Sequence, residues 1–230
     1  MPPTPIPDDT TRQRLIEAAG QTFADLGFRN ATIREISTRA GANVAAVNYH
    51  FGDKNALYAE VLRYAHACAI SKYPPDMGLP VTSRPEKKLE AFVRSFLLRL
   101  LDTGRPAWHA RLMARELAEP TVALDVLVHE QIKPHFLALL AIVRELLNKN
   151  APEASLRATC SSIVGQCLFY HFGAPITARL FPDKTYSASD VDALAAHITR
   201  FSLAGIRAVG QSLTQTSKPS TKPQRQRAKT

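Results

Sequence analysis

One stretch of this chain, residues 32–57, constrains the fold more than any other. Thr32 can accept a hydrogen bond from the backbone N–H of Glu35, and the Glu35 side chain can reach back to the N–H of Thr32. This capping box predicts that a helix starts here. Gly41 stands where that helix would end in a left-handed residue, and Asn43 stands where the next helix needs an N-cap. We therefore predict two helices joined by a short turn.

The second of these helices, over residues 44–50, is too short to be stable alone in water. Its neighbours must hold it, which suits an element whose outer face serves a partner. A helix, a short turn with glycine and a second presenting helix make up the helix-turn-helix plan, in which the second helix enters the DNA major groove. DNA binding by residues 44–50 is therefore the first functional hypothesis.

Helical patterning continues along the rest of the chain. Apolar residues recur at helical spacing, and neither strand alternation nor an internal repeat is visible. We expect an all-α fold of about nine helices, with a loop near Pro175 and Pro182. The expected helices span approximately 10–26, 32–40, 44–50, 54–73, 85–102, 107–118, 121–147, 152–173 and 189–210. Pro134 should kink the seventh near Glu130–Gln131, because proline lacks an N–H and its ring clashes with the carbonyl four residues earlier.

These segments suggest a division of the chain into four parts. We expect a disordered lead over residues 1–9, a helix-turn-helix DNA-binding domain over 10–55, a C-terminal ligand-binding and dimerisation domain over 56–213, and a disordered basic tail over 214–230. The helix that begins at Lys54, capped by Asp53, would join the two domains mechanically.

Charge alone does not argue for nucleic-acid binding. The net charge is +9, yet residues 214–230 carry five Lys and Arg and no acidic residue, so over half of the excess lies in the tail. DNA binding therefore rests on the motif, and a few well-placed phosphate contacts suffice for it.

Composition also bounds where the protein works. Three cysteines without tight spacing favour the reducing cytoplasm. The first eleven residues lack the basic and apolar regions of a secretory signal. No apolar run approaches about 18 residues, so we expect no membrane partner. Neither a metal nor another cofactor is expected, and the chain should not be an enzyme, because no catalytic motif is found.

Residues 10–60 resemble the N-terminal domain of TetR-family transcriptional repressors. The matching positions are Thr32, Ala40-Gly41, Asn43, Asn48-Tyr49-His50-Phe51, Asp53-Lys54 and Ala56-Leu57. Arg115–Pro120, Ile132–Pro134 and Gly165–Tyr170 resemble the ligand domain of the CecR (YbiH-like) subgroup. The resemblance implies a homodimer that binds a double-stranded DNA operator and loses operator affinity when a small-molecule effector binds.

The same resemblance implies which residues touch DNA. The expected set is Thr32, Asn43, Val44, Ala45, Asn48, Tyr49, His50 and Lys54, with Thr32, Lys54 and an aromatic of the Tyr49–Phe51 segment on phosphate. Val44 and Ala45 have apolar side chains, so they can contact bases only by apolar contacts, for example with thymine methyls. A phosphate near Lys54 would also meet the free N–H groups of a helix start. The plainer alternatives are that Thr32 is only a cap and Lys54 only a solvated side chain.

A second site is expected in the C-terminal half. Polar or aromatic residues that stand on otherwise apolar faces are Trp108, His109, Arg111, Arg115, Glu116, His129, Gln166, Tyr170 and His171. Such convergent groups are typical of a ligand cavity, for which our candidates are Trp108, Arg111, Glu116, Gln166, Phe169 and Tyr170. The alternative is that these residues pair with each other or face water.

Residues 152–173 and 189–210 are apolar on more than one side. Two such helices from each chain would form a four-helix interface about a two-fold axis; the alternative is simple burial. Cys160 and Cys167 share a face and are expected in the core. A competing function is a helical ligand-binding or scaffold protein with a basic tail and no sequence-specific DNA readout.

Overall fold

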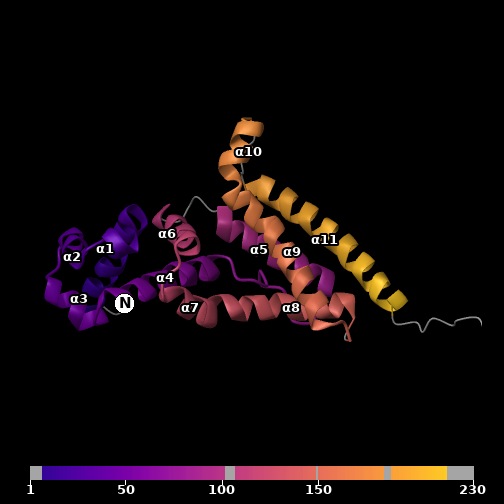
Figure 1. The fold of residues 1–230 in the computed structure, drawn as a ribbon, viewed down its shortest axis with the longest axis horizontal. Helices are drawn as coiled ribbons and strands as arrows, with labels where there is room; N and C mark the ends of the chain where they lie inside the picture. The colour runs from indigo at the N-terminus through magenta and orange to yellow at the C-terminus, as the bar shows by residue number, and fades with distance from the viewer. Residues whose placement is uncertain (1–6, 102–106, 149, 184–187, 217–230) are drawn as a thin grey trace, which may run out of the picture.

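The computed structural model describes residues 7–101, 107–148, 150–183 and 188–216. Within these ranges every regular element is helical, which confirms the all-α prediction. The elements are α1 Pro7–Asn30, α2 Ile33–Ala40, α3 Val44–Phe51, α4 Lys54–Lys72, α5 Pro85–Leu101, α6 Ala107–Ala118, α7 Ala123–Leu127, η1 Val128–Ile132, α8 Lys133–Leu147, α9 Glu153–Phe172, α10 Ala174–Leu180 and α11 Ala188–Thr216. Figure 1 shows α1–α3 gathered at one end, with α4 leading into the larger helical body.

Local capping fixes the helix-turn-helix as the sequence predicts. The Thr32 hydroxyl accepts from the Glu35 N–H at 3.2 Å, and the Glu35 carboxylate accepts from the Thr32 N–H at 2.9 Å. Gly41 ends α2 with φ 60° and ψ 37°, a left-handed conformation that glycine adopts without a steric penalty. Asn43 Oδ1 then accepts from the Ala45 N–H at 3.0 Å and starts α3.

The segment that precedes Pro134 departs from α-helical geometry. Residues 128–132 form a π-helical turn, and the Lys133 N–H bonds to the carbonyl of Val128. Pro134 has no N–H to give to the carbonyl of Glu130, so the chain there takes a wider turn. The kink expected near Glu130–Gln131 stays a prediction, and the structure shows a π-helical turn at that place. The consequence of this turn is that the long helix expected over 121–147 divides into α7, η1 and α8.

Three element boundaries differ from the sequence prediction. α1 begins at Pro7, not near residue 10, because proline fits the first turn of a helix; the rest of the expected lead lies outside the described residues. Likewise α11 extends to Thr216, so residues 214–216 are helical and the remainder of the expected tail lies outside them. In place of a loop, Pro175 stands in the first turn of α10.

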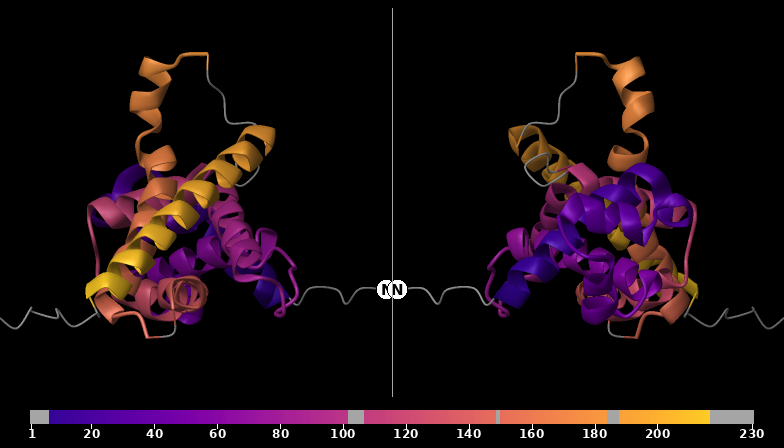
Figure 2. Two further views of the ribbon diagram at one scale, coloured as in Figure 1. Left: turned by 90° about the vertical axis from the view of Figure 1, so that its right-hand side faces the viewer. Right: turned by 90° about the vertical axis from the view of Figure 1, so that its left-hand side faces the viewer.

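Two hydrophobic cores hold the described helices together. The first joins α1–α4 and also takes in Trp108 and Leu112 of α6 and Ala123 of α7. The second joins α5, α8, α9 and α11, and it contains Cys160 and Cys167, which confirms their core placement. Figure 2 shows α11 crossing the body and α10 standing away from it. α6 therefore belongs to the core of the N-terminal unit although it lies far along the chain.

One described segment, Ala123–Leu147, passes the length and composition test for a membrane span. Its most apolar 18-residue window has a mean hydropathy of 1.4, and 22% of that window is buried in the protein. The segment is not an unbroken apolar run, because Asp125, Glu130 and Lys133 interrupt it. Leu139, Leu140 and Val143 of this segment pack into the second core, and the π-helical turn interrupts it.

Candidate nucleic-acid interface and ligand cavity

The outer face of α3 and the turns beside it expose most of the predicted DNA contacts. Six of the eight predicted side chains are exposed, namely Thr32, Asn43, Val44, Ala45, Asn48 and Tyr49. His50 and Lys54 are half-buried. Val47 points inward and is fully buried in the first core, which anchors α3 from behind. The short helix is thus held from one side and presents the other, as its length predicts.

Apolar surface dominates the start of α3. Val44 is 44% exposed and Tyr49 is 77% exposed, although both are large and hydrophobic. The cap at Asn43 uses only its Oδ1, so the two Nδ2 donors of this exposed amide can face a partner. The face therefore offers an alkyl group, an aromatic ring and an amide, which suit base edges better than phosphates.

The Thr32 hydroxyl is already engaged in the protein. Besides accepting from the Glu35 N–H, it donates to Glu35 Oε2 at 2.8 Å. These hydrogen bonds from Thr32, first through its side chain and then through its backbone, lower the pKa of the Glu35 carboxyl. A phosphate at Thr32 would have to displace this carboxylate. The phosphate contact of Thr32 thus stays a prediction, and the Glu35 carboxylate would compete with the phosphate for the Thr32 hydroxyl.

Lys54 ties the start of α4 to the end of α1. Its ammonium donates to the carbonyl of Arg29 at 3.3 Å and lies 4.6 Å from the centroid of the Phe28 ring. Burial lowers the pKa of this ammonium, and the charge of Glu35 acts in the opposite direction. An ammonium has three donors, so a phosphate can still be bound. Lys54 is nevertheless not the solvated side chain of the simpler interpretation.

Half of the predicted ligand set holds α6 against the N-terminal unit instead. Trp108 is 2% exposed, and its Nε1 donates to Glu17 of α1 at 3.2 Å. Arg111 forms an exposed ion pair with Asp25 at 3.0 Å. Glu116 is fully buried, and its carboxylate accepts from the hydroxyl of Tyr58 at 2.8 Å. The open alternative, pairing within the protein, describes these three residues.

The other half of the set lies on α9. Gln166 donates to the carbonyl of Ser162 and to the hydroxyl of Ser202 on α11. Phe169 is 53% exposed, and Tyr170 is half-buried. None of the six candidates is among the described residues that line the body's cavity, so the predicted lining set is not the one that the fold assembles.

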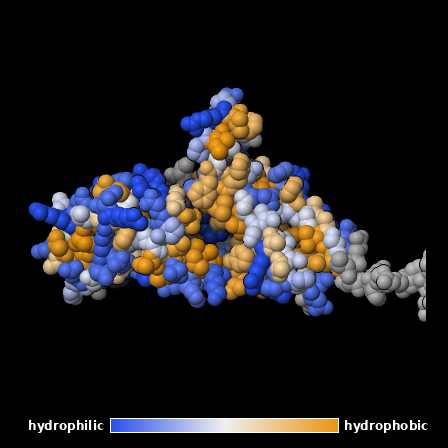
Figure 3. Space-filling model, in the orientation of Figure 1, coloured by the Kyte–Doolittle hydropathy of each residue, from blue (hydrophilic) through white to orange (hydrophobic). Residues whose placement is uncertain are grey.

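That cavity, of ≈ 350 Å³, opens between α4, α5, α6, η1, α8 and α9. Its size is at the lower end of the range for small-molecule sites. Figure 3 shows a hollow in the middle of the molecule, rimmed by hydrophobic surface. The lining residues are Ala65, His66, Ala69, Phe92, Phe96, Arg99, Leu100, His109, Ala110, Met113, Ala114, Leu117, Ile132, His135, Phe136, Val164, Leu168, His171 and Phe172.

The sequence offered a partial signal for this lining. His109 and His171 stand on apolar helix faces, a pattern that they share with Trp108 and Glu116. Their spacing cannot tell a side chain that faces a cavity from one that faces a neighbouring helix. That distinction depends on which helices become neighbours in space.

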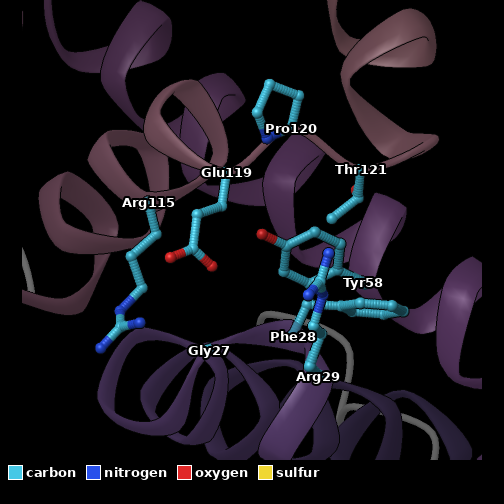
Figure 4. A pocket seen from close by; sticks show the side chains of 8 residues that line it. All are labelled: Gly27, Phe28, Arg29, Tyr58, Arg115, Glu119, Pro120 and Thr121. Atoms are coloured by element: carbon cyan, nitrogen blue, oxygen red, sulfur yellow. The ribbon is translucent and has the colours of Figure 1, made fainter.

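A second cleft, of ≈ 320 Å³, lies beside the junction of α1, α4 and α6. Figure 4 shows Arg115 reaching from α6 toward Gly27, with Glu119 and Tyr58 beside it. Arg115 Nε donates to the carbonyl of Ala24 at 2.9 Å, and its Nη2 donates to that of Asp25 at 3.1 Å. Gly27 has φ 79° and ψ 163°, a region that only glycine adopts readily. The broken end of α1 is thus fastened by α6.

Two family profiles match separate parts of the chain. The profile described as "Bacterial regulatory proteins, tetR family" matches residues 15–61. The profile described as "HTH-type transcriptional dual regulator CecR, C-terminal domain" matches residues 85–206. The first contains every predicted DNA contact, and the second contains most of the cavity.

Individual relatives agree with the profiles. The HTH-type transcriptional dual regulator CecR of Shigella flexneri is 29% identical over 188 residues, which cover 75% of this chain and 80% of that protein. The HTH-type transcriptional repressor NicS of Pseudomonas putida is 32% identical over 94 residues, 40% of this chain and 43% of that one.

Solved structures share the fold. A transcriptional regulator from Rhodococcus sp. Rha1 superposes with a TM-score of 0.61 at 19% identity, covering 84% of this chain and 96% of that one. The TetR-family regulator PfmR from Thermus thermophilus gives a TM-score of 0.58 at 15% identity, with coverage of 84% and 95%.

Proposed function

Because the chain belongs to the TetR family of DNA-binding transcriptional regulators and carries a CecR-type C-terminal domain, we propose that it is a ligand-responsive repressor. In this proposal a homodimer binds a palindromic operator. A small-molecule effector binds the cavity between α4, α5, α6, η1, α8 and α9, which we call the α4–α9 cavity, and releases the protein from DNA. A soluble bacterial regulator works where the chromosome lies, so we place it in the cytoplasm. Residues 10–55 would form the reading domain, and residues 56–213 the ligand-binding and dimerisation domain.

The observation that carries the proposal is that one face of α6 packs against the DNA-reading unit and another face lines the cavity. Trp108 and Leu112 pack into the first core with the DNA-reading helices. Met113, Ala114 and Leu117, on the same helix, line the cavity. A ligand that displaces one face of α6 must therefore act on the other, because a helix moves as a rigid element.

α4 supports the same coupling along its length. Leu57 and Val61 lie in the first core, whereas His66 and Ala69 line the cavity. Its first residue, Lys54, bonds to the end of α1. A cavity that fits its ligand best when α4 and α6 have shifted would favour a different separation of the two reading heads. Coupling of about 1–3 kcal/mol is enough for induction, and it must be reciprocal.

Dimerisation is supported by the exposed apolar surface of α9 and α11. Phe169 of α9 and Phe201 of α11 are 53% and 65% exposed, whereas Ile163 and Ile206 on the same helices are buried in the second core. A helix that is apolar on two sides suits a partner as well as its own core. Two-fold pairing would set the recognition helices about 34–36 Å apart, one turn of DNA.

The test is a gel shift with the DNA upstream of the protein's own gene. A dimer by sedimentation that shifts this DNA, but not a scrambled duplex of equal length, supports the proposal. Equal binding to both duplexes would favour the competing function, a helical ligand-binding protein with a basic tail and no sequence readout. A reporter fused to the same DNA then tests repression, since it should be more active without the protein.

A further inference from the structure

The side chains that line the cavity restrict the charge of the molecule that it can take. Every ionisable side chain among the described lining residues is basic: His66, Arg99, His109, His135 and His171. The remaining lining residues are aliphatic, aromatic or methionine, and none carries a carboxylate. We propose that the effector is an apolar molecule with a single anionic group, such as an aromatic or aliphatic carboxylate. This inference rests on the proposed function, since it names the ligand of the same cavity.

Three of the five basic groups, which come from three helices, lie close together. The ring centroids of His66 on α4 and His135 on α8 are 5.4 Å apart. Burial lowers the pKa of His135, and the hydrogen bond to the Gln131 carbonyl acts in the opposite direction. The positive charge of Arg99 on α5 lowers this pKa further. An anion placed there would relieve this repulsion, because it interacts favourably with Arg99 and with a protonated imidazole at once.

Arg99 is positioned to receive a carboxylate. Its Nε donates to the carbonyl of Ser95 at 3.3 Å, and its guanidinium carbon lies 5.3 Å from the centroid of the Phe96 ring. These contacts orient the guanidinium, which has five N–H donors in all. The planar fork of a guanidinium matches the two oxygens of a carboxylate.

His135 can adapt to the same group. Its Nδ1 lies 2.6 Å from the carbonyl oxygen of Gln131, and a carbonyl only accepts, so Nδ1 carries the proton. The Nε2 of the neutral ring is then an acceptor, and in the imidazolium it is a donor. A carboxylate would favour the imidazolium, and the protonated acid could donate to the neutral ring.

The apolar walls explain why charge should decide between ligands of one shape. Phe92, Phe136 and Leu168 supply a surface that any hydrophobic body can cover. An ion that enters such a site loses hydration and needs a compensating partner. An anion meets the positive charge of Arg99, and a neutral molecule needs no charged partner. A cation meets only basic ionisable groups among the described lining residues. The expected order of affinity is anion, neutral molecule, cation.

Three naphthalene ligands of matched shape test this order in the full-length protein. N-phenyl-1-naphthylamine serves as a neutral fluorescent reporter, and 1-naphthoate, 1-naphthylmethanol and 1-naphthylmethylammonium compete for it. We expect 1-naphthoate to displace the reporter at a concentration at least about tenfold below the alcohol, with the ammonium weakest. Ala114→Phe should fill the cavity and abolish displacement, provided that its circular dichroism is unchanged.

Arg99→Gln isolates the charge. It should lower the affinity for 1-naphthoate to that for the alcohol, and change the affinity for the alcohol by no more than about twofold. Arg94→Gln is the matched control, because Arg94 is on the same helix but pairs with Asp192 outside the cavity. Equal affinity of anion and alcohol, equal effects of the two arginine variants, or naphthoate binding that survives Ala114→Phe would each overturn the inference.

The gel shift separates this inference from the proposed function. Release of operator DNA by the alcohol or the ammonium, but not by 1-naphthoate, would refute the anionic class and leave ligand-responsive regulation standing. Tight, Arg99-dependent binding of 1-naphthoate with the operator still bound would support the charge preference of the cavity and count against its role in induction.

Discussion

The hydroxyl of Tyr58 donates to the carboxylate of Glu116 at a distance of 2.8 Å, inside the protein. Tyr58 is 2% exposed and Glu116 is fully buried. Thr121 adds two donors to the same carboxylate, its N–H at 2.9 Å and its hydroxyl at 3.0 Å. A buried carboxylate is stable only when hydrogen bonds replace its hydration. The junction of α4 with α6 is therefore held by one buried polar cluster. The loss of any of its donors would leave the Glu116 carboxylate short of a hydrogen bond.

Tyr58→Phe should destabilise the protein by about 1–3 kcal/mol, because Glu116 would lose a donor that water cannot replace. Urea unfolding followed by circular dichroism measures the loss. Tyr64→Phe is the matched control: its hydroxyl bonds to Glu17 at 3.0 Å, but Tyr64 is only half-buried, so water can take its place. Equal losses in the two variants would contradict the claim that burial makes Glu116 depend on the hydroxyl of Tyr58.

Gly20→Ala should weaken the docking of α6 on α1. A Cβ at position 20 would lie 2.4 Å from the nearest atom of the Trp108 indole, so the ring must move, at a cost of about 1–3 kcal/mol. Trp108→Phe removes the ring atoms that would clash. In that background Gly20→Ala should cost less than half as much in urea unfolding, a coupling that a double-mutant cycle detects. Equal costs in both backgrounds would contradict the contact.

Asn43→Ala is expected to alter which base pairs the protein prefers at one position of the operator, and also to cost about 1 kcal/mol as a lost N-cap. Asn43→Ser separates the two effects, since serine keeps the cap but removes the amide donors. Binding to a set of single-base operator variants measures the preference. A uniform loss of affinity over all variants would assign Asn43 to the phosphate backbone instead.

Lys54→Ala should weaken binding to every sequence alike and lower the slope of log affinity against log salt by about one. Lys72→Ala, at the far end of the same helix, removes an equal charge away from the reading head and should leave the slope unchanged. The slopes are compared by anisotropy titrations at salt concentrations of about 50 to 200 mM, a range in which protein–DNA affinity changes strongly. An unchanged slope for Lys54→Ala would refute its phosphate role.

The helix-turn-helix was predictable because its signals are local. Thr32, Asn43 and Asp53 cap helices through residues two or three positions away, and Gly41 supplies a conformation that few residues adopt. Pro134 likewise marks a departure from regular helix nearby, although the π-helical form of the turn was not predicted. Each of these features needs no knowledge of the rest of the fold.

The cavity was not predictable in the same way. Trp108 and His109 are neighbours in sequence, yet the first packs on α1 and the second lines the cavity. A turn of about 100° per residue on α6 separates their roles, and only the positions of α1, α4 and α9 decide which direction faces the hollow. The sequence identified polar residues on apolar faces but could not assign each one to a neighbour.

In the proposed mechanism, a ligand in the α4–α9 cavity and operator DNA each lower the affinity of the protein for the other. The direct measurement is the dissociation constant of fluorescent operator DNA, by anisotropy, at increasing concentrations of 1-naphthoate. We expect a loss of operator affinity of about 5-fold or more at saturation, and an equal loss of 1-naphthoate affinity when operator is bound. Operator affinity that stays constant while 1-naphthoate demonstrably fills the cavity would contradict this mechanism.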